Sequence, residues 1–220
     1  YYLRNTKNLL MDSPVSMTTG FSSYLMNVGQ LRNQGIELEI NSTNIKTKDL
    51  EWKTTFNLSH NKNKVIKLDG DQTQIVSGTQ IRKIGHSYRT FYMIEFAGIN
   101  PENGNPQFYT NELLDDGTYS KEITEDATKA RAIMLKKHAE PNVTGGLYNS
   151  IRYKWFDLSF LFNYQFGAYA YDTWAQKTEH GGYDMEANIP TYYADSWKKP
   201  GDITKYEQFY EKSSKVAMHK

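Results

Sequence analysis

Histidines are the side chains of this sequence best suited to metal binding and proton transfer. The chain has five of them, at His60, His86, His138, His180 and His219. No two follow a His-x3-His spacing and none lies in a His-Glu-x-x-His segment, the arrangements that hold zinc on one face of a helix. The absence of cysteine excludes disulfides, thiol catalysis and cysteine-based zinc sites. We therefore predict no metal site, no cofactor, and surface or loop positions for the histidines.

Two carboxylates, Glu37 and Glu39, are spaced two residues apart in a segment that alternates like a β-strand. Residues at this spacing share one face of a strand. Glycosidases use two carboxyl groups about 5–10 Å apart, which this spacing allows. No acid partner or pocket is signalled, so we interpret the pair as charges kept in water. A hydrolase would need a triad or metal signature that the sequence lacks, and we predict that the chain is not an enzyme.

A third group of candidates is aromatic and lies in the last 50 or so residues of the chain. These side chains are Trp174, Tyr183, Tyr192, Tyr193 and Trp197. Flat aromatic faces stack on sugar rings or peptide side chains, so we predict that this segment contacts a substrate. Two other interpretations stay open: the loop packs against itself, or it contacts a partner protein.

The composition limits the class of protein. The chain has 220 residues, 38% of them hydrophobic, and no apolar run approaches the ~20 residues that a membrane-spanning helix needs. The formal net charge is +1, which gives no support for nucleic-acid binding. Aromatic residues make up 14% of the chain and tyrosine leads them, as suits a surface with one dry side and one wet side.

Two hairpins carry the same alternation of apolar and polar residues. One joins 35–41 to 50–59 through a short turn at 46–49, and the other joins 145–153 to 156–166 through a turn at 154–155. Alternation places the apolar residues of each arm on one face. The predicted apolar face comprises Ile36, Leu38, Ile40, Trp52, Phe56, Leu58, Phe156, Leu158, Phe160, Phe162, Tyr164 and Phe166.

Five long strands are predicted, separated by connections of very unequal length. The strands are expected at 1–11, 25–44, 51–68, 142–153 and 156–172, and the long loops at 12–24, 69–141 and 173–220. Shorter strands are expected within 81–99 and 107–114, and one helix at 122–138.

Long strands, short turns at one end and long loops at the other are typical of an outer-membrane barrel, whose strands need about 9–11 residues to cross the bilayer. In such a barrel the apolar face contacts lipid. The alternative is a soluble β-sandwich, in which the phenylalanines of 156–166 would be buried against a second sheet. The aromatic face and the alternation of connection lengths favour the barrel.

Several segments resemble the SusC/RagA family of TonB-dependent transporters of the Gram-negative outer membrane. The similar segments are YYLRNTKNLL (1–10), TGFSS (19–23), NVG (27–29), NQGIEL (33–38), FYMIEFAGINPENGNP (91–106), PNVTGGLYNS (141–150) and YKWFDLS (153–159). They span residues 1 to about 170 in the family's order. The chain departs from the family at 107–140, where relatives carry an acidic loop, so any metal or ligand role of that loop is not carried over.

The resemblance implies an all-β fold: part of a large antiparallel transmembrane β-barrel of the TonB-dependent transporter type, of about 22 strands, with long extracellular loops. It implies that residues 1–220 are a fragment from the C-terminal half of that barrel domain, with the plug domain and the closing strands absent. Five strands cannot close a barrel, since the smallest have about eight.

The implied function is import of oligosaccharides or oligopeptides across the outer membrane of a Gram-negative bacterium. The implied partners are a SusD-like surface lipoprotein, the substrate, membrane lipid, and TonB through the missing N-terminal part. A secreted or cell-surface β-sandwich binding module without transport activity stays open as the alternative.

Overall fold

The computed structural model describes residues 1–14, 18, 20–21, 23–179, 181 and 188–209. The chain divides into two compact units. Unit 1 comprises Tyr1–Phe91 and Lys136–Tyr169, and unit 2 comprises Tyr92–Leu135 and Ala170–Lys220. Among the described residues, no helix combines the length and the apolar composition needed to cross a membrane.

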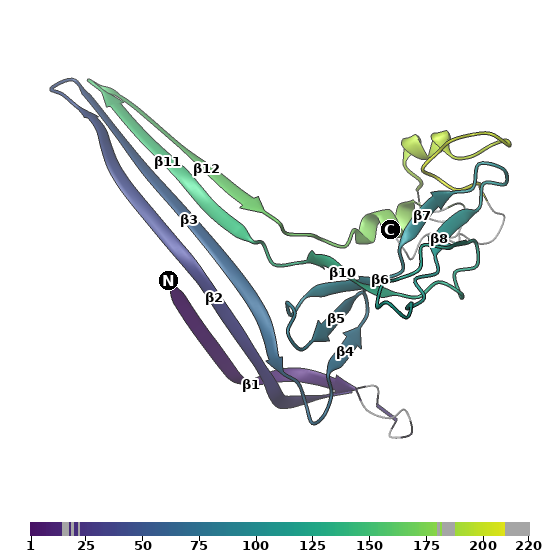
Figure 1. The fold of residues 1–220 in the computed structure, drawn as a ribbon. Coiled ribbons are helices and arrows are strands. Elements are labelled where there is room, and N and C mark those ends of the chain that lie inside the picture. Colours follow the sequence, from purple (N-terminus) through teal and green to yellow (C-terminus); the bar gives the residue numbers. More distant parts are fainter. Residues whose placement is uncertain (15–17, 19, 22, 180, 182–187, 210–220) are drawn as a thin grey trace. The chain divides into compact units, whose positions relative to one another are not determined.

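Unit 1 is built on a five-stranded antiparallel sheet in the order β1-β2-β3-β11-β12 (Figure 1). Its strands are β1 (Tyr2–Pro14), β2 (Ser23–Lys46), β3 (Leu50–Lys67), β11 (Val143–Tyr153) and β12 (Phe156–Phe166). The strand expected at 156–172 ends earlier than predicted, at Phe166. Gly167 follows with a left-handed φ of 78°, which stops the strand.

The segment expected to be one long loop, 69–141, is folded into short strands. β4 (Gln74–Ser77), β5 (Gln80–Lys83), β6 (Thr90–Met93) and β10 (Ile133–His138) form a four-stranded sheet in the order β10-β6-β5-β4. The chain passes between the two units within β6 and β10. A small core of Val65, Leu68 and Ile75 lies where the end of β3 meets β4, with Leu31 and Tyr88 packed against it.

The described residues of unit 2 form the three-stranded sheet β7-β8-β9, one short α-helix and one 3-10 helix. The elements are β7 (Phe96–Ile99), β8 (Pro106–Tyr109), β9 (Ile123–Thr124), α1 (Thr173–Thr178) and the 3-10 helix Thr191–Asp195. Phe108 is fully buried and meets Phe96 edge to face, with ring centroids 6.2 Å apart.

The helix expected at 122–138 is absent from the structure, and this prediction was wrong. Residues 123–124 form β9 and Ile133–His138 form β10. The backbone between them is held by contacts that a helix would break. Arg131 N donates to Thr110 O at 2.9 Å, and Asp126 accepts from its neighbour Thr128 N at 3.0 Å in a local turn. Such aspartate turns compete with helix formation.

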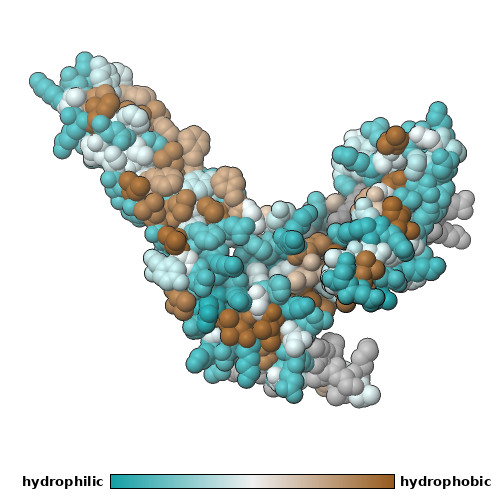
Figure 2. Space-filling view, viewed as in Figure 1, coloured by the Kyte–Doolittle hydropathy of each residue, from teal (hydrophilic) through white to brown (hydrophobic). Residues whose placement is uncertain are grey.

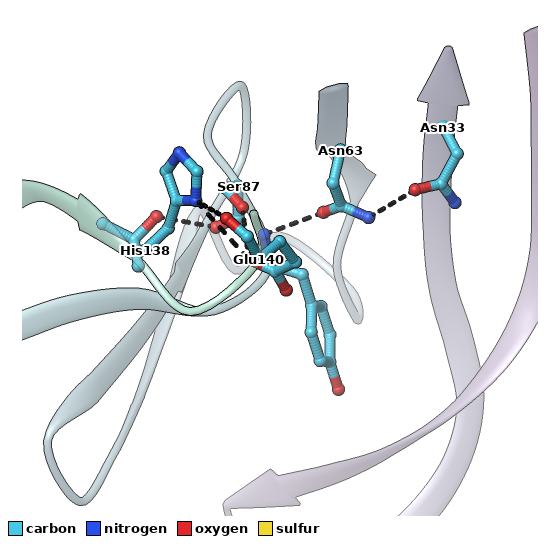
Figure 3. A network of polar contacts seen from close by, with 7 residues as sticks. Asn33, Asn63, Ser87, His138 and Glu140 are labelled. Carbon is cyan, nitrogen blue, oxygen red and sulfur yellow. Dashed lines mark hydrogen bonds and ion pairs between the residues drawn. The ribbon is translucent and has the colours of Figure 1, made fainter. Parts of the chain in front are cut away.

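A polar network ties the long strands to the segments that follow them (Figure 3). Asn63 on β3 accepts from Tyr88 N at 2.9 Å and donates to Asn33 Oδ1 on β2 at 2.8 Å. Ser87 Oγ donates to Glu140 Oε2 at 2.9 Å. These contacts hold the chain around residue 140 close to the C-terminal end of β3.

Candidate functional site

The strand register places all twelve residues of the predicted apolar face on the same side of the five-stranded sheet. Directly paired residues of antiparallel strands point to the same side. One row across the sheet is Ile40, Phe56, Leu147 and Phe162, because Ile40 pairs with Phe56, Phe56 with Leu147, and Leu147 with Phe162. The remaining rows are Ile36-His60-Val143-Phe166, Leu38-Leu58-Gly145-Tyr164, Ser42-Thr54-Asn149-Phe160, Ile45-Trp52-Ile151-Leu158 and Leu50-Tyr153-Phe156. The last of these rows lies next to the short turns.

This apolar face is open in the structure and is not the interior of a sandwich. Phe162 and Phe166 are 62% and 63% exposed, and Phe156 is 51% exposed. The space-filling view shows hydrophobic surface along the long strands (Figure 2). A soluble protein would rarely leave a patch of this size uncovered. The sandwich alternative requires these rings to be buried, and within unit 1 they are not.

The rings of the apolar face contact one another along the sheet. Phe56 on β3 stacks with Tyr164 on β12, with centroids 6.4 Å apart, and Phe160 meets Phe162 edge to face at 5.5 Å. Tyr164 also donates its hydroxyl to Asn57 O at 2.8 Å. These contacts link aromatic side chains of β3 and β12 across the apolar face.

One row of the apolar face, Ser42-Thr54-Asn149-Phe160, is polar on three of its four strands, and the sequence analysis did not single it out. Asn149 on β11 is only 5% exposed, and its Oδ1 accepts from Trp52 Nε1 at 3.0 Å and from Thr54 Oγ1 at 2.7 Å. Thr54 in turn accepts from Asn44 Nδ2 at 2.6 Å. The signal in the sequence was an asparagine at a position where the alternation calls for an apolar residue.

The opposite face of the sheet is polar and carries Glu37 and Glu39. Both are exposed, and Glu39 Oε1 accepts from Asn41 Nδ2 at 2.8 Å. Towards the short turns, Glu51 is bound by Arg152 at 2.7 Å and by Lys53 at 3.0 Å. Among the described residues no group of three or more histidines, aspartates or glutamates could hold a metal ion.

The three histidines that the structure describes do not converge. His60 Nδ1 lies 2.7 Å from Asn142 O on the apolar face, and His138 Nδ1 lies 2.7 Å from Glu140 O in the network of Figure 3. The backbone of His86 pairs with Val65, at 2.8 Å between Val65 N and His86 O. His180 and His219 lie outside the described residues.

The aromatic loop residues divide into exposed and packed ones, all within unit 2. Trp174 on α1 is 75% exposed and Tyr192 is 45% exposed. Tyr192 Oη donates to Glu179 Oε1 at 2.6 Å, and this hydrogen bond raises the pKa of Tyr192 to about 12. Tyr183 lies outside the described residues.

The other two predicted contact residues, Tyr193 and Trp197, pack within unit 2, and substrate contact by them stays a prediction. Tyr193 is 1% exposed, and its ring lies 5.0 Å from that of Tyr206. Trp197 donates Nε1–H to Pro101 O at 2.8 Å, and a side chain at Gly104 would lie 2.5 Å from its indole ring. In this conformation neither ring offers an open face comparable to that of Trp174.

A carboxylate that the sequence analysis missed fixes the turn at 100–105. Glu125 accepts hydrogen bonds from the side-chain amides of Asn100, Asn103 and Asn105, at 2.6, 3.0 and 2.8 Å for the shortest contact of each. Asn100 and Asn103 also cap the turn, each accepting from the backbone N–H two residues later. The side-chain amides of these asparagines already donate to Glu125, so we interpret the cluster as one that stabilises the turn.

Comparison with known sequences finds receptors of one kind. The chain is 36% identical over 183 residues to TonB-dependent receptor P3 of Formosa agariphila, covering 76% of this chain and 18% of that protein. It is 26% identical over 245 aligned positions to TonB-dependent receptor P39 of the same organism, covering 93% and 23%. It is 28% identical over 184 residues to TonB-dependent receptor SusC of Bacteroides thetaiotaomicron, covering 77% and 17%. No family model matches the sequence.

Solved structures give the same result for the fold. The chain superposes on a structure of the RagAB peptide transporter with a TM-score of 0.84 at 26% identity, covering 97% of this chain and 24% of that one. The closed-closed state of the RagAB peptide importer gives a TM-score of 0.83 at 26% identity, with the same coverages. The chain thus spans between 17% and 24% of the length of these relatives. By sequence and by fold, the chain belongs to the SusC/RagA family of TonB-dependent receptors and corresponds to a part of their β-barrel.

Proposed function

We propose that this chain forms part of the barrel wall and the entry region of an importer in the outer membrane of a Gram-negative bacterium. The apolar face of the five-stranded sheet contacts lipid, and the opposite face lines a water-filled passage. The substrates are oligosaccharides or oligopeptides, a SusD-like surface lipoprotein is the partner at the cell surface, and TonB supplies the energy through a part of the receptor outside this chain.

The observation that carries the proposal is the common face of the twelve apolar residues together with the length of their strands. β12 has 11 residues, so the ten steps from its first to its last residue, at about 3.4 Å each, make it roughly 34 Å long. Tilted by about 40°, such a strand rises roughly 26 Å, close to the ~25 Å apolar band of outer-membrane barrels. In such a barrel the polar face of the sheet contacts water and the apolar face contacts lipid, so neither face lies in an unfavourable environment.

The polar face fits the wall of a passage. Glu37, Glu39 and Asn41 extend from β2 into this face, and the Glu51–Arg152 ion pair lies nearer the short turns. Exposed charges of this kind would be costly in hydrocarbon and cost little beside water. The edge strands β1 and β12 would pair with further strands of the receptor, because unpaired backbone groups in lipid cost several kcal/mol each.

Substrate contact falls to the exposed aromatic residues of unit 2. Trp174 and Tyr192 are the predicted contact residues that the described chain leaves open to solvent. Tyr183 stays a candidate. The Tyr192–Glu179 pair offers a carboxylate beside a ring, which suits hydroxyl groups of a sugar and amide groups of a peptide equally.

The test of the lipid-facing role is a charge placed on either face of β12. Phe160→Arg in the receptor that carries this chain should block assembly in the outer membrane, because an arginine near the bilayer midplane costs about 2–4 kcal/mol. The matched control is Ser159→Arg, one residue away on the polar face, which should assemble like the wild type. Assembly is measured as the outer-membrane fraction that keeps its folded mobility on an unheated detergent gel.

The competing function, a secreted or surface binding module without transport, predicts a different outcome. Phe160→Arg would then yield a misfolded soluble protein, and the wild type would be recovered from the medium or the cell surface without detergent. Recovery of a folded, water-soluble wild-type protein would overturn the proposal.

A further inference from the structure

The two short turns of the five-stranded sheet lie side by side and form one surface. Lys154 N donates to Asp49 O at 2.7 Å, which joins the β11–β12 turn to the β2–β3 turn. The β2–β3 turn is closed by Thr47 N, which donates to Leu50 O at 2.7 Å. Lys154 has a left-handed backbone with a φ of 52°, so the tight turn sets the direction in which its side chain leaves the backbone. Side chains from both hairpins therefore share one tip.

This tip combines exposed aromatic rings with exposed ammonium groups. Trp155 is 89% exposed and Tyr153 is 50% exposed. Lys154 Nζ lies 5.4 Å from the centre of the Tyr153 ring, and Lys48 projects from the neighbouring turn. We call Lys48, Tyr153, Lys154 and Trp155 the basic-aromatic tip.

The charge of this end of the sheet is positive. Residues 46–53 and 152–157 hold five basic and three acidic side chains. One of the acids, Glu51, is already engaged by Arg152 and Lys53. Among the described residues, neither Lys48 nor Lys154 takes part in an ion pair. Their charges are available to an anion from outside the chain.

The position of the tip along the strands sets what it meets. The last row of the apolar face is Leu50, Tyr153 and Phe156, and Lys154 and Trp155 come immediately beyond it. If the apolar face spans the hydrocarbon, as proposed above, the tip lies at the depth of the lipid headgroups. Tryptophan and tyrosine prefer this interface, and lysine near an anionic lipid surface gains about 1 kcal/mol.

We propose that the basic-aromatic tip binds the headgroups of anionic phospholipids. Trp155 enters the interfacial layer, and Lys48 and Lys154 pair with headgroup phosphates. This inference rests on the proposed membrane-spanning role, and it adds a lipid specificity that the apolar face alone would not have. Hydrocarbon contact requires no charge, whereas two unpaired lysines beside an exposed indole select a negative surface.

The experiment uses the complete receptor that carries this chain, purified in detergent and titrated with phosphatidylglycerol or phosphatidylcholine. Bound lipid is counted by native mass spectrometry. The variant is Lys48→Gln with Lys154→Asn, since asparagine tolerates the left-handed backbone at 154. The control is Lys198→Gln with Lys199→Asn, two exposed lysines of unit 2 whose replacement changes the net charge equally.

Wild type and control should retain phosphatidylglycerol in preference to phosphatidylcholine, and the tip variant should bind it roughly 30-fold more weakly, as expected for two lost lysine–headgroup interactions. Brominated phosphatidylglycerol should quench tryptophan fluorescence of the wild type, and Trp155→Phe should weaken that quenching, with Trp52 on the apolar face accounting for a remainder. Equal phosphatidylglycerol binding by tip variant and control would overturn the inference, as would quenching that is equally strong in Trp155→Phe and the wild type.

The two proposals fail separately. A receptor that assembles in the membrane, and is blocked by Phe160→Arg, but whose lipid binding ignores Lys48 and Lys154, refutes only the headgroup site. A wild-type receptor that is folded and soluble without detergent refutes the membrane-spanning role, and the headgroup site with it.

Discussion

Tyr164 on β12 lies directly across Gly145 on β11, and its hydroxyl reaches past the glycine to Asn57 O on β3 at 2.8 Å. Because Gly145 has no side chain, the ring of Tyr164 fits over its backbone. Tyr2 and Gly35 repeat the arrangement on the other side of the sheet, where Tyr2 Oη donates to Asn61 Oδ1 at 2.9 Å. In both pairs one tyrosine ties three neighbouring strands together.

Gly145→Ala is therefore expected to destabilise the wall. A methyl group at Gly145 would overlap the Tyr164 ring and the Asn57 carbonyl, and the carbonyl belongs to backbone that is fixed in the sheet. Overpacking of this kind costs about 1–3 kcal/mol. The measurement is the temperature at which the receptor loses its folded mobility on a detergent gel.

Gly146→Ala is the matched control for that change. Its methyl group would come no closer than 3.3 Å to a neighbour, the side-chain oxygen of Asn163, which can move. The control should melt near the wild-type temperature. Equal melting temperatures for Gly145→Ala and Gly146→Ala would mean that the Tyr164–Gly145 contact does not limit the stability of the sheet.

Asn149→Leu tests the polar row on the apolar face. Leucine matches the surrounding apolar pattern, but it removes the acceptor of Trp52 Nε1–H and Thr54 Oγ1–H. A donor left unsatisfied away from water costs about 1–3 kcal/mol, so in the membrane the variant should be less stable in spite of its greater hydrophobicity. Denaturant unfolding of the receptor in lipid measures the change in free energy.

Trp52→Phe in the Asn149→Leu background separates the two explanations of that result. If lost hydrogen bonds cause the destabilisation, phenylalanine removes one of the unsatisfied donors, Trp52 Nε1–H, and recovers part of the stability. If leucine simply fits the space poorly, the second substitution has no such effect, and the interpretation of Asn149 as an acceptor is wrong.

The sequence predicted the long sheet well because a two-residue period records a physical constraint. Each strand of the sheet has one apolar and one polar side, so the twelve residues of the predicted face could be assigned before their partners were known. The register between strands could not. It is fixed by pairings over long sequence distances, such as Leu147 with Phe56, which no local pattern encodes.

Prediction failed where distant contacts override local preference. Residues 122–138 contain good helix formers, yet Glu125 is held by three asparagine amides and Arg131 pairs with Thr110. Tyr193 looked equivalent to Tyr192 in the sequence, but one ring is buried and the other exposed. A 3-10 turn at Thr191–Asp195 sends the two neighbours in different directions, and the sequence does not mark which is which.

Tyr192 should titrate at a pH well above that of an ordinary tyrosine. Its hydrogen bond to Glu179 favours the protonated phenol and raises its pKa to about 12 from 10.0. A raised folded-state pKa means that the contribution to stability is complete below pH 10.0 and is lost as pH rises through about 12. Phenolate absorbance of the wild type minus that of Tyr192→Phe isolates this titration.

Glu179→Gln should move the Tyr192 titration back towards the ordinary tyrosine value, because the carboxylate is the main cause of the shift. Glu102→Gln removes an exposed carboxylate of the same unit that does not contact Tyr192, and it should leave the titration unchanged. A titration that stays high in Glu179→Gln would assign the shift to burial rather than to the hydrogen bond.

Glu125→Gln is expected to loosen the turn at 100–105. The carboxylate accepts from three asparagine amides, whereas glutamine offers one acceptor oxygen and places an NH2 group against those donors. Losing these partners costs about 1–3 kcal/mol, which should raise hydrogen exchange of the turn amides by roughly tenfold or more. Glu122→Gln, an exposed carboxylate three residues earlier in the chain, controls for the loss of charge alone. Because Trp197 packs on Gly104 within this turn, the fluorescence of Trp197 should change in Glu125→Gln and stay constant in the control. Unchanged hydrogen exchange in Glu125→Gln would show that backbone pairing between β7 and β8 is sufficient to hold the turn.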